Sequence, residues 1–260
     1  MQDQLPPQLP PSRGDEFRLV LGLFTRLPLG DLPLLPAGGL GRAVWAFPLA
    51  GAVVGLLAGL MVLVGAEFSL GPWLLALVAI AAELMITGAF HEDGFADIAD
   101  GMGGRDVEAR LRIMRDSRIG TFGSAALWLN LTARLVLLAG IAGTGGAWGV
   151  VLALVAANAG GRLALLLPLL LLDPARPDGL GASVGRVRGE LGWTAAVYAF
   201  GIGLVCLGWG VVPAALAVLA AGMIATFYGL HRLGGYTGDL LGATASLAMI
   251  LILLAAADHV

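Results

Sequence analysis

The chain has 260 residues, of which 58% are hydrophobic and only 13% are charged. Soluble domains usually carry about 25% charged residues, so this composition excludes an ordinary soluble globule and indicates a protein that lies in a bilayer. The formal net charge of -3 is nearly balanced, which argues against nucleic acid as a partner.

The N-terminal residues 1–16 are polar and rich in proline, with no apolar stretch of the signal-peptide type. We expect them to form a disordered tail. Residues 17–260 are predicted to form a single transmembrane catalytic domain. Its first part, Phe17–Leu35, is interrupted by Arg, Asp and Pro residues and is more typical of an interfacial helix and loop than of a crossing.

Six apolar stretches follow, and each approaches the roughly 20 residues that a helix needs to cross the hydrocarbon core. They are Val44–Ala66, Leu70–Phe90, Phe122–Gly143, Trp148–Leu172, Leu191–Leu230 and Leu240–Ala257. The stretch at 191–230 is long enough for two crossings, and Gly210–Pro213 provides a turn between them. The sequence therefore predicts an all-α, polytopic membrane helix bundle of about seven transmembrane helices.

Glycine recurs every four residues in the first of these stretches, at Gly51, Gly55 and Gly59. Small residues along one helix face let two backbones approach closely in lipid. We therefore expect this face to meet another helix.

Arginine is unevenly distributed among the predicted loops. The loops after the first, third and fifth spans contain no Arg, whereas the N-terminal region and the loops after the second, fourth and sixth spans contain all but two of them. Because basic loops stay in the cytoplasm, the N-terminus is predicted to be cytoplasmic and the C-terminus to be outside. The expected location is the bacterial inner membrane, with the reactive side chains facing the cytoplasm.

The segment 91–121 is predicted to carry the chemistry. Asp93, Asp97 and Asp100 are spaced by four and then three residues, which puts their carboxylates on one helical face. We expect them at the cytoplasmic end of the second span, where such like charges repel unless a cation neutralises them. Hard oxygen ligands favour Mg²⁺, although a solvated acidic loop is the alternative. Asp239, near the start of the last span, is a fourth candidate ligand or only a helix N-cap.

A cluster of arginines interleaved with small polar residues follows the acids: Arg110, Arg112, Arg115 and Arg118, with Asp116, Ser117 and Thr121. Guanidinium groups match phosphate geometry and stabilise charge during phosphoryl transfer. The cluster therefore favours a site for substrate phosphate. The alternative is a set of cytoplasmic arginines that serves topology or anionic lipid.

Ionisable groups inside predicted spans are costly and are functional candidates by default. Arg134 and Arg162 are such groups, and Glu83 is a possible ion-pair partner for either. Functional and structural roles therefore stay open for these three residues. His91, next to the acids, is a candidate general base, or else an interfacial histidine.

Two consecutive motifs in this region resemble the signature of the cobalamin synthase family, the adenosylcobinamide-GDP ribazoletransferases. They are FHEDGFADIADGMGG (90–104) and RLRIMRDSRIGTFG (110–123). Four more motifs follow the family's order over nearly the whole chain: FTRLP (24–28), FPLAGAVVG (47–55), ARPDGLG (175–181) and GGYTGDLLGA (234–243).

This resemblance implies a Mg²⁺-dependent transfer of the cobinamide phosphate moiety from adenosylcobinamide-GDP to α-ribazole or its 5′-phosphate, with release of GMP, as the last assembly step of cobalamin. We assign catalytic roles to His91, Asp93 and Asp116, and metal binding to Asp93, Asp97, Asp100 and Asp239. Substrate phosphate binding is assigned to Arg110, Arg115, Ser117, Arg118, Thr121 and Arg162.

Two other functions are weighed against this one. The run from Asp97 to Arg105 approximates the first half of the CDP-alcohol phosphotransferase motif DxxDGxxAR, which leaves a lipid-head-group transferase as an alternative. A transporter would use Glu83, Arg134 and Arg162 as pathway groups. The expected partners are the small-molecule substrates and the lipid bilayer, and a homo-oligomer stays open.

Overall fold

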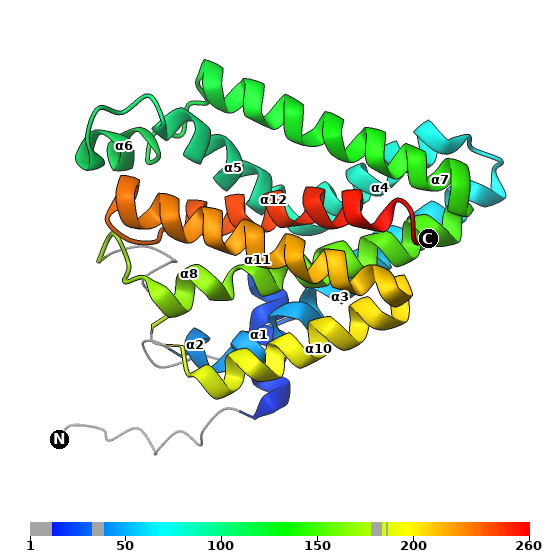
Figure 1. Cartoon of the computed structure of the whole chain (residues 1–260), viewed down its shortest axis with the longest axis horizontal. Coiled ribbons are helices and arrows are strands. Elements are labelled where there is room, and N and C mark those ends of the chain that lie inside the picture. The colour runs from blue at the N-terminus through cyan, green and yellow to red at the C-terminus, as the bar shows by residue number, and fades with distance from the viewer. Residues whose placement is uncertain (1–11, 33–38, 178–183, 186) are drawn as a thin grey trace.

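The structure is a computed structural model that describes residues 12–32, 39–177, 184–185 and 187–260. In these ranges it contains helices and turns, and one isolated bridge between Pro174 and Tyr236. The α-helices are α1 (Arg13–Phe24), α2 (Leu40–Ala43), α3 (Phe47–Glu67), α4 (Pro72–Thr87), α5 (Phe90–Gly101), α6 (Val107–Ile113), α7 (Thr121–Ala164), α8 (Leu166–Leu171), α10 (Gly189–Leu207), α11 (Val211–Tyr228) and α12 (Gly238–Ala256). Figure 1 shows them as one bundle, which confirms the predicted all-α class.

Two long helical stretches fold back on themselves at glycines. In α7 the chain reverses at Gly146, whose φ of 63° and ψ of -162° are not helical. A similar reversal separates α10 from α11 at Gly208, where φ is 54° (Figure 1). The sequence placed this second turn at Gly210–Pro213, but Pro213 lies in the first turn of α11, where proline needs no hydrogen-bonded N–H.

The second predicted span is wrong in one respect. It does not continue into the acidic segment as one helix, because α4 ends and the axis turns by 89° into α5. Gly88 and Ala89 both adopt the left-handed conformation, with φ of 67° and 57°. A left-handed alanine is uncommon and interrupts a right-handed helix. The acids therefore lie on a separate helix, α5.

By length and composition, four helical stretches in the described residues can cross a membrane, or five if α4 and α5 count as one broken span. Two of the four contain the reversals at Gly146 and Gly208, so the multi-pass membrane class is confirmed. The number of seven spans and the cytoplasmic N-terminus stay predictions.

The N-terminal region contains a short helix. The first 11 residues of the predicted tail lie outside the described ranges, and Ser12 caps α1 in a capping box with Asp15. Residues 13–16 are thus helical and not part of a tail. With 12 residues, about 18 Å at 1.5 Å per residue, α1 is too short to cross, as expected for Phe17–Leu35.

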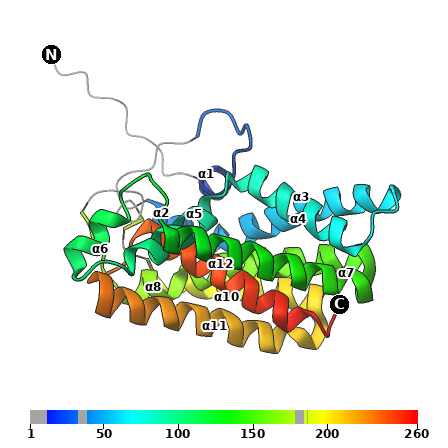
Figure 2. The same ribbon diagram turned by 90° about the horizontal axis from the view of Figure 1, so that it is seen from above.

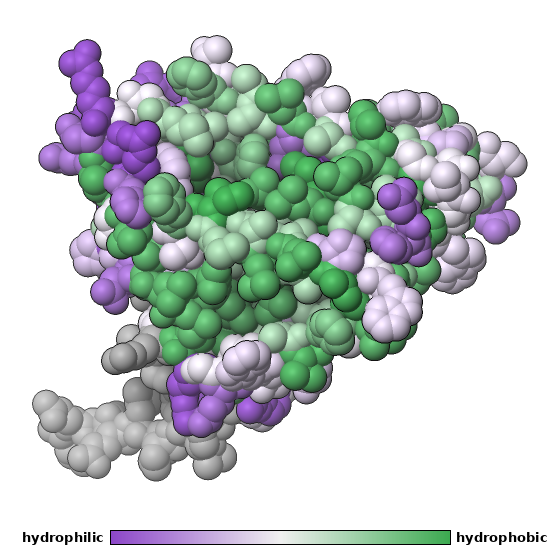
Figure 3. Space-filling view, viewed as in Figure 1, coloured by the Kyte–Doolittle hydropathy of each residue, from purple (hydrophilic) through white to green (hydrophobic). Residues whose placement is uncertain are grey.

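The two ends of the bundle differ in polarity. The loops around α6 and α8 lie at one end, opposite the C-terminus and the turn of α7 (Figures 1 and 2). Figure 3 shows hydrophilic side chains gathered at the α6 end and a broad hydrophobic surface over the middle of the bundle. Large apolar residues of α10 and α11 are exposed, among them Val205, Leu216 and Phe227, as expected for contact with lipid.

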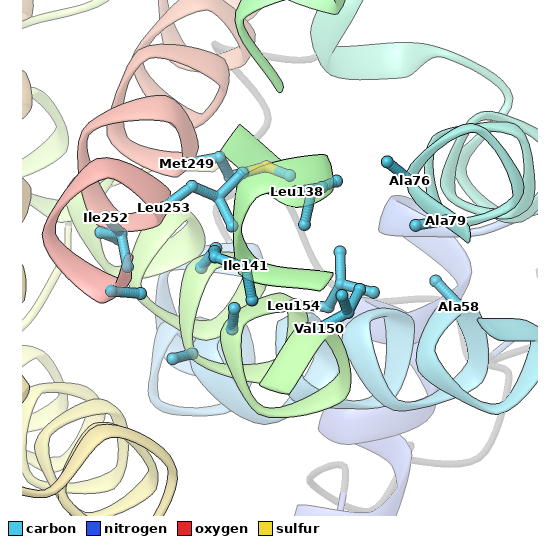
Figure 4. Close-up of a cluster of buried hydrophobic side chains, with 14 of the residues drawn as sticks. Ala58, Ala76, Ala79, Leu138, Ile141, Val150, Leu154, Met249, Ile252 and Leu253 are labelled. Carbon is cyan, nitrogen blue, oxygen red and sulfur yellow. The ribbon is translucent and has the colours of Figure 1, made fainter. Parts of the chain in front are cut away.

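The core surrounds both halves of α7. Small side chains on α3 and α4, such as Ala58, Ala76 and Ala79, face larger ones of α7, including Leu138 and Leu154 (Figure 4). Methionine and aliphatic side chains of α12 close the other side of the cluster. This packing holds α12 beside α7, which matters for the site below.

The glycine stripe on α3 meets α7, as predicted. A Cβ atom at Gly51 or Gly55 would collide with the backbone carbonyl of Asn158 or Leu154. At Gly59 it would come within 3.0 Å of the Val151 side chain. The two helices are therefore in direct backbone contact along this stripe.

We expect Gly55→Ala to destabilise the protein by about 1–3 kcal/mol, because overpacking here can be relieved only by moving a helix. The matched control is Gly140→Ala, since a Cβ at this helical glycine meets nothing within 4 Å. The thermal unfolding midpoint in detergent should fall for the first variant and hold or rise for the second. Equal midpoints for the two variants would refute the close α3–α7 contact.

Candidate active site

Helices α5 and α12 touch through a glycine. A Cβ at Gly94 would lie 2.7 Å from the backbone oxygen of Asp239 and 3.0 Å from its Cα. The absence of a side chain therefore lets the start of α12 approach the middle of α5. This contact brings Asp239 to the acids of α5, as the sequence analysis anticipated.

The four carboxylates act on one another electrostatically. Burial, followed by the nearby charges of Asp93, Asp239 and Asp100, raises the pKa of Asp97 to about 7, and Arg176 opposes this. Asp239, in the first turn of α12, is half-buried among these charges. The acids from α5 and α12 therefore share one half-buried, water-accessible site.

Asp100 differs from the other acids because both of its oxygens have backbone partners. They accept N–H groups of Gly120 and Gly123, each at 2.7 Å. These donors lie at the start of α7, where orphan N–H groups favour a carboxylate. Asp100 thus fixes the loop that carries the arginine cluster to the acid site.

The described residues contain no group of three or more His, Cys, Asp or Glu side chains already arranged around a metal position. Mg²⁺ does not require such a cage, because it usually binds one or two carboxylates and completes its shell with water and substrate phosphates. Exposed Asp93 and half-buried Asp97 and Asp239 offer only oxygen ligands, which fits this mode of binding.

Arg176 is a functional candidate that the residue-by-residue reasoning missed. Its Nη2 lies 3.5 Å from Asp239 Oδ2. The backbone around it is held by hydrogen bonds from Ala175 to Tyr236 and from Tyr236 to Asp173, at 2.8 and 2.9 Å. The signal was the motif at 175–181, of which residues 178–181 lie outside the described ranges.

The arginine cluster is divided between surface and interior. Arg115, Ser117, Arg118 and Thr121 are exposed between α6 and the start of α7. Arg110 is buried instead and donates to the backbone oxygen of Arg232 at 3.3 Å. Its guanidinium therefore joins α6 to the segment between α11 and α12. This is a structural role, whereas the sequence predicted that Arg110 binds substrate phosphate.

Asp116 has a local partner. It accepts from Arg118 Nη2 at 2.8 Å and from Arg118 Nε at 3.1 Å. This pairing lowers the pKa of Asp116 to about 2, which makes it a poor proton acceptor. The geometry favours a role in orienting Arg118 over the predicted catalytic role.

A buried polar network occupies the interior of the bundle. Arg134 is fully buried and pairs with Glu83 of α4 and with Glu92 of α5, the latter at 2.6 Å. Asn158 donates to Glu83 and accepts from Arg162 Nη1 at 2.5 Å. The ion-pair alternative is thus confirmed for Arg134, and Glu92 is a partner that the sequence analysis missed.

Arg162 has no exposed surface and lies over the ring of Phe24, 5.7 Å from its centroid. Arg162 was predicted to bind substrate phosphate, but its side chain is enclosed and belongs to the buried network. His91 is also buried, with 2% of its surface exposed. Its ring stacks on Phe24 with centroids 5.7 Å apart, and its Nε2 has no partner among the described residues.

Fold and site together define a multi-pass helical membrane protein with an acidic and basic site between α5, α12 and the start of α7. A family model described as cobalamin-5-phosphate synthase matches residues 16–257. The chain belongs to this family, as its motifs predicted.

Three curated relatives share one name. The adenosylcobinamide-GDP ribazoletransferase of Bradyrhizobium diazoefficiens is 42% identical over 93% of both chains. Its namesake in Xanthobacter autotrophicus is 45% identical over 90% of this chain and 92% of its own. The one in Ralstonia nicotianae is 40% identical, with the same coverage. No solved structure matches the chain.

Proposed function

We propose that the chain transfers the cobinamide phosphate moiety of adenosylcobinamide-GDP to α-ribazole or its 5′-phosphate and releases GMP, the last assembly step of cobalamin. The names of its relatives support this reaction. The structural observation that carries it is the approach of Asp239 and Arg176 to the acids of α5. Phosphoryl transfer needs carboxylate oxygens that bind a metal ion and guanidinium groups that bind the phosphate.

Mg²⁺ is the proposed cofactor, held by Asp93, Asp97 and Asp239 together with phosphate oxygens of the substrate. When bound, it supplies positive charge to the phosphate that is transferred. Asp100 positions the start of α7 beside these ligands through its two backbone hydrogen bonds. Of the three residues predicted to be catalytic, His91, Asp93 and Asp116, only Asp93 belongs to this group of acids. Its side chain is exposed.

Phosphate binding falls to the exposed residues Arg115, Ser117, Arg118 and Thr121, together with Arg176 beside Asp239. Guanidinium forks suit phosphate oxygens, and Asp116 holds one fork in place. We place this site on the cytoplasmic face of the bacterial inner membrane, because the Arg-bearing loops lie at the same end.

The test is product formation by the purified protein in detergent or liposomes. GMP should be released from adenosylcobinamide-GDP only when both α-ribazole and Mg²⁺ are present. Release of CMP from a CDP-alcohol donor with a lipid acceptor, and no GMP, would favour the lipid-head-group transferase instead. Solute flux in liposomes without either product would favour a transporter.

The raised pKa of Asp97 predicts a pH dependence for metal binding. Below about pH 7 this carboxyl carries a proton, which competes with a cation, and above it the carboxylate is free. We expect the dissociation constant for Mg²⁺, measured by calorimetry, to be about tenfold larger at pH 6 than at pH 8. An Asp97→Asn variant, which lacks this carboxyl, should bind Mg²⁺ only weakly at both pH values. A flat profile in the unmodified protein would contradict the prediction.

A further inference from the structure

Helix α5, which carries three of the acids, does not continue the direction of the helix before it. The chain between α4 and α5 passes through two left-handed residues, Gly88 and Ala89, and the two helix axes differ by 89°. After such a break, small changes in a few backbone dihedral angles are enough to swing or rotate a helix of 12 residues. Contacts with neighbouring helices therefore have to set the orientation of α5.

Helix α5 lies between the first half of α7 and α12 (Figure 1). Near the end of α5, the two backbone hydrogen bonds of Asp100 attach it to the start of α7. Near the start of α5, Glu92 Oε1 accepts from Arg134 Nη1 of α7 at 2.6 Å. Asp93 and Asp97 lie between these two attachments, so α7 holds the stretch of α5 that carries them.

The attachment at Arg134 is held from two sides. Its Nη2 pairs with Glu83 of α4, while its Nη1 pairs with Glu92 of α5. The guanidinium is planar, so these two partners together fix the direction in which each nitrogen points. Glu92 is only 5% exposed and Arg134 has no exposed surface, so little water competes for the pair.

Glu92 and Asp93 are neighbours in sequence but point in different directions. Successive side chains on an α-helix are about 100° apart, and Glu92 is buried whereas Asp93 is exposed. Because Glu92 is held against α7, the rotation of α5 about its own axis is set, and so is the direction of its acidic face. The close contact of Gly94 with the backbone of Asp239 depends on the same rotation, since any other residue would bring a side chain to that point.

We propose that Glu92 is a positioning residue: through its ion pair with Arg134 it sets the rotation of α5 that directs Asp93 and Asp97 to the cation site. The inference rests on the proposed function and deepens it, because it concerns the same acid site. The alternative is that Glu92 only balances charge in the buried network. In that case Glu83, which pairs with the same guanidinium, would be equivalent to it.

Binding of Mn²⁺ in the presence of GDP, measured by electron paramagnetic resonance, separates the two roles. Glu92→Leu detaches α5 from Arg134 and should raise the dissociation constant for Mn²⁺ by about tenfold or more, the usual effect of losing a group that orients metal ligands. Glu83→Leu removes the same charge from the same guanidinium but on α4, and should change this constant by less than about threefold. Glu92→Gln loses the charge but keeps an oxygen for Arg134, so it should also stay within about threefold.

Thermal unfolding midpoints in detergent report a purely structural role. Glu83 also accepts from Asn158, so Glu83→Leu should lower the midpoint at least as much as Glu92→Leu does. Stability and Mn²⁺ affinity are therefore expected to fall in different orders among these variants. If Mn²⁺ affinity follows the midpoints, or if Glu92→Gln binds Mn²⁺ as weakly as Glu92→Leu, the inference is wrong.

Glu92→Asp extends the test if Glu92→Leu does not fold. It keeps the charge and shortens the side chain by one carbon, so Mn²⁺ binding should weaken although the charge balance is unchanged. Affinity equal to that of the unmodified protein would overturn the inference. Absence of GMP release in the unmodified protein would count against the proposed function, whereas GMP release and Mn²⁺ binding that are indifferent to Glu92 would count against this inference alone.

Discussion

Asp97→Asn is expected to lower kcat/KM for GMP release by about 10³-fold, and Asp93→Asn by a similar factor. Each substitution removes one negative oxygen from the acid site, where a bound cation contributes several kcal/mol to the stabilisation of charge during phosphoryl transfer. The change in size is negligible, so the fold should be retained. Rates of GMP release as a function of the concentration of each substrate, together with thermal unfolding midpoints, check this expectation.

The matched control for these variants is Asp106→Asn. Asp106 belongs to the same segment and caps α6 by accepting from the backbone N–H of Ala109 at 2.8 Å. Asn caps helices about as well as Asp, so activity and stability should both stay near those of the unmodified protein. A loss of activity as large as that of Asp97→Asn would show that overall charge, and not the acid site, matters.

Arg134→Met is expected to destabilise the protein by about 3–5 kcal/mol, because it leaves Glu83 and Glu92 buried without their shared cation. This is a large share of the usual stability of a folded protein, about 5–15 kcal/mol. Unfolding in detergent should show a much lower midpoint, and the yield of folded protein should fall.

Charge balance provides the control for this variant. The buried network around Arg134 joins two acids, Glu83 and Glu92, to two arginines, Arg134 and Arg162. Glu92→Gln added to Arg134→Met therefore leaves Glu83 balanced by Arg162 through Asn158. The double variant should regain part of the lost stability. Arg188→Met, in an exposed pair with Glu190, should leave the midpoint unchanged. If the double variant is less stable than Arg134→Met, charge balance does not determine the stability of the buried network.

Hydropathy predicted the membrane bundle because apolar length and small-residue spacing are properties of the sequence itself. Both reversals were predicted approximately, the first between the stretches that end at Gly143 and begin at Trp148, and the second at Gly210–Pro213, whereas the chain turns at Gly146 and Gly208. The bend between α4 and α5 did not, because it depends on a left-handed alanine, and counts of apolar residues contain no information about φ. The same bend turns α5 against α12 and so creates the acid site.

The acid site was predicted better than the arginine contacts. Helical spacing placed Asp93, Asp97 and Asp100 on one helix, and Gly94 made room for Asp239. Burial is set by tertiary packing, so the sequence did not show that Arg162 is enclosed in the interior. Arg176 was missed for a related reason, since it reaches Asp239 through backbone pairing between loops far apart in the chain.

Binding of Mn²⁺ in place of Mg²⁺ tests the central claim most directly, namely that the acids of α5 and α12 form a divalent cation site. Electron paramagnetic resonance of the purified protein with GDP should show loss of the free Mn²⁺ signal at micromolar concentrations, and Asp97→Asn should restore it. A free signal that persists in the unmodified protein, with and without nucleotide, would contradict the account.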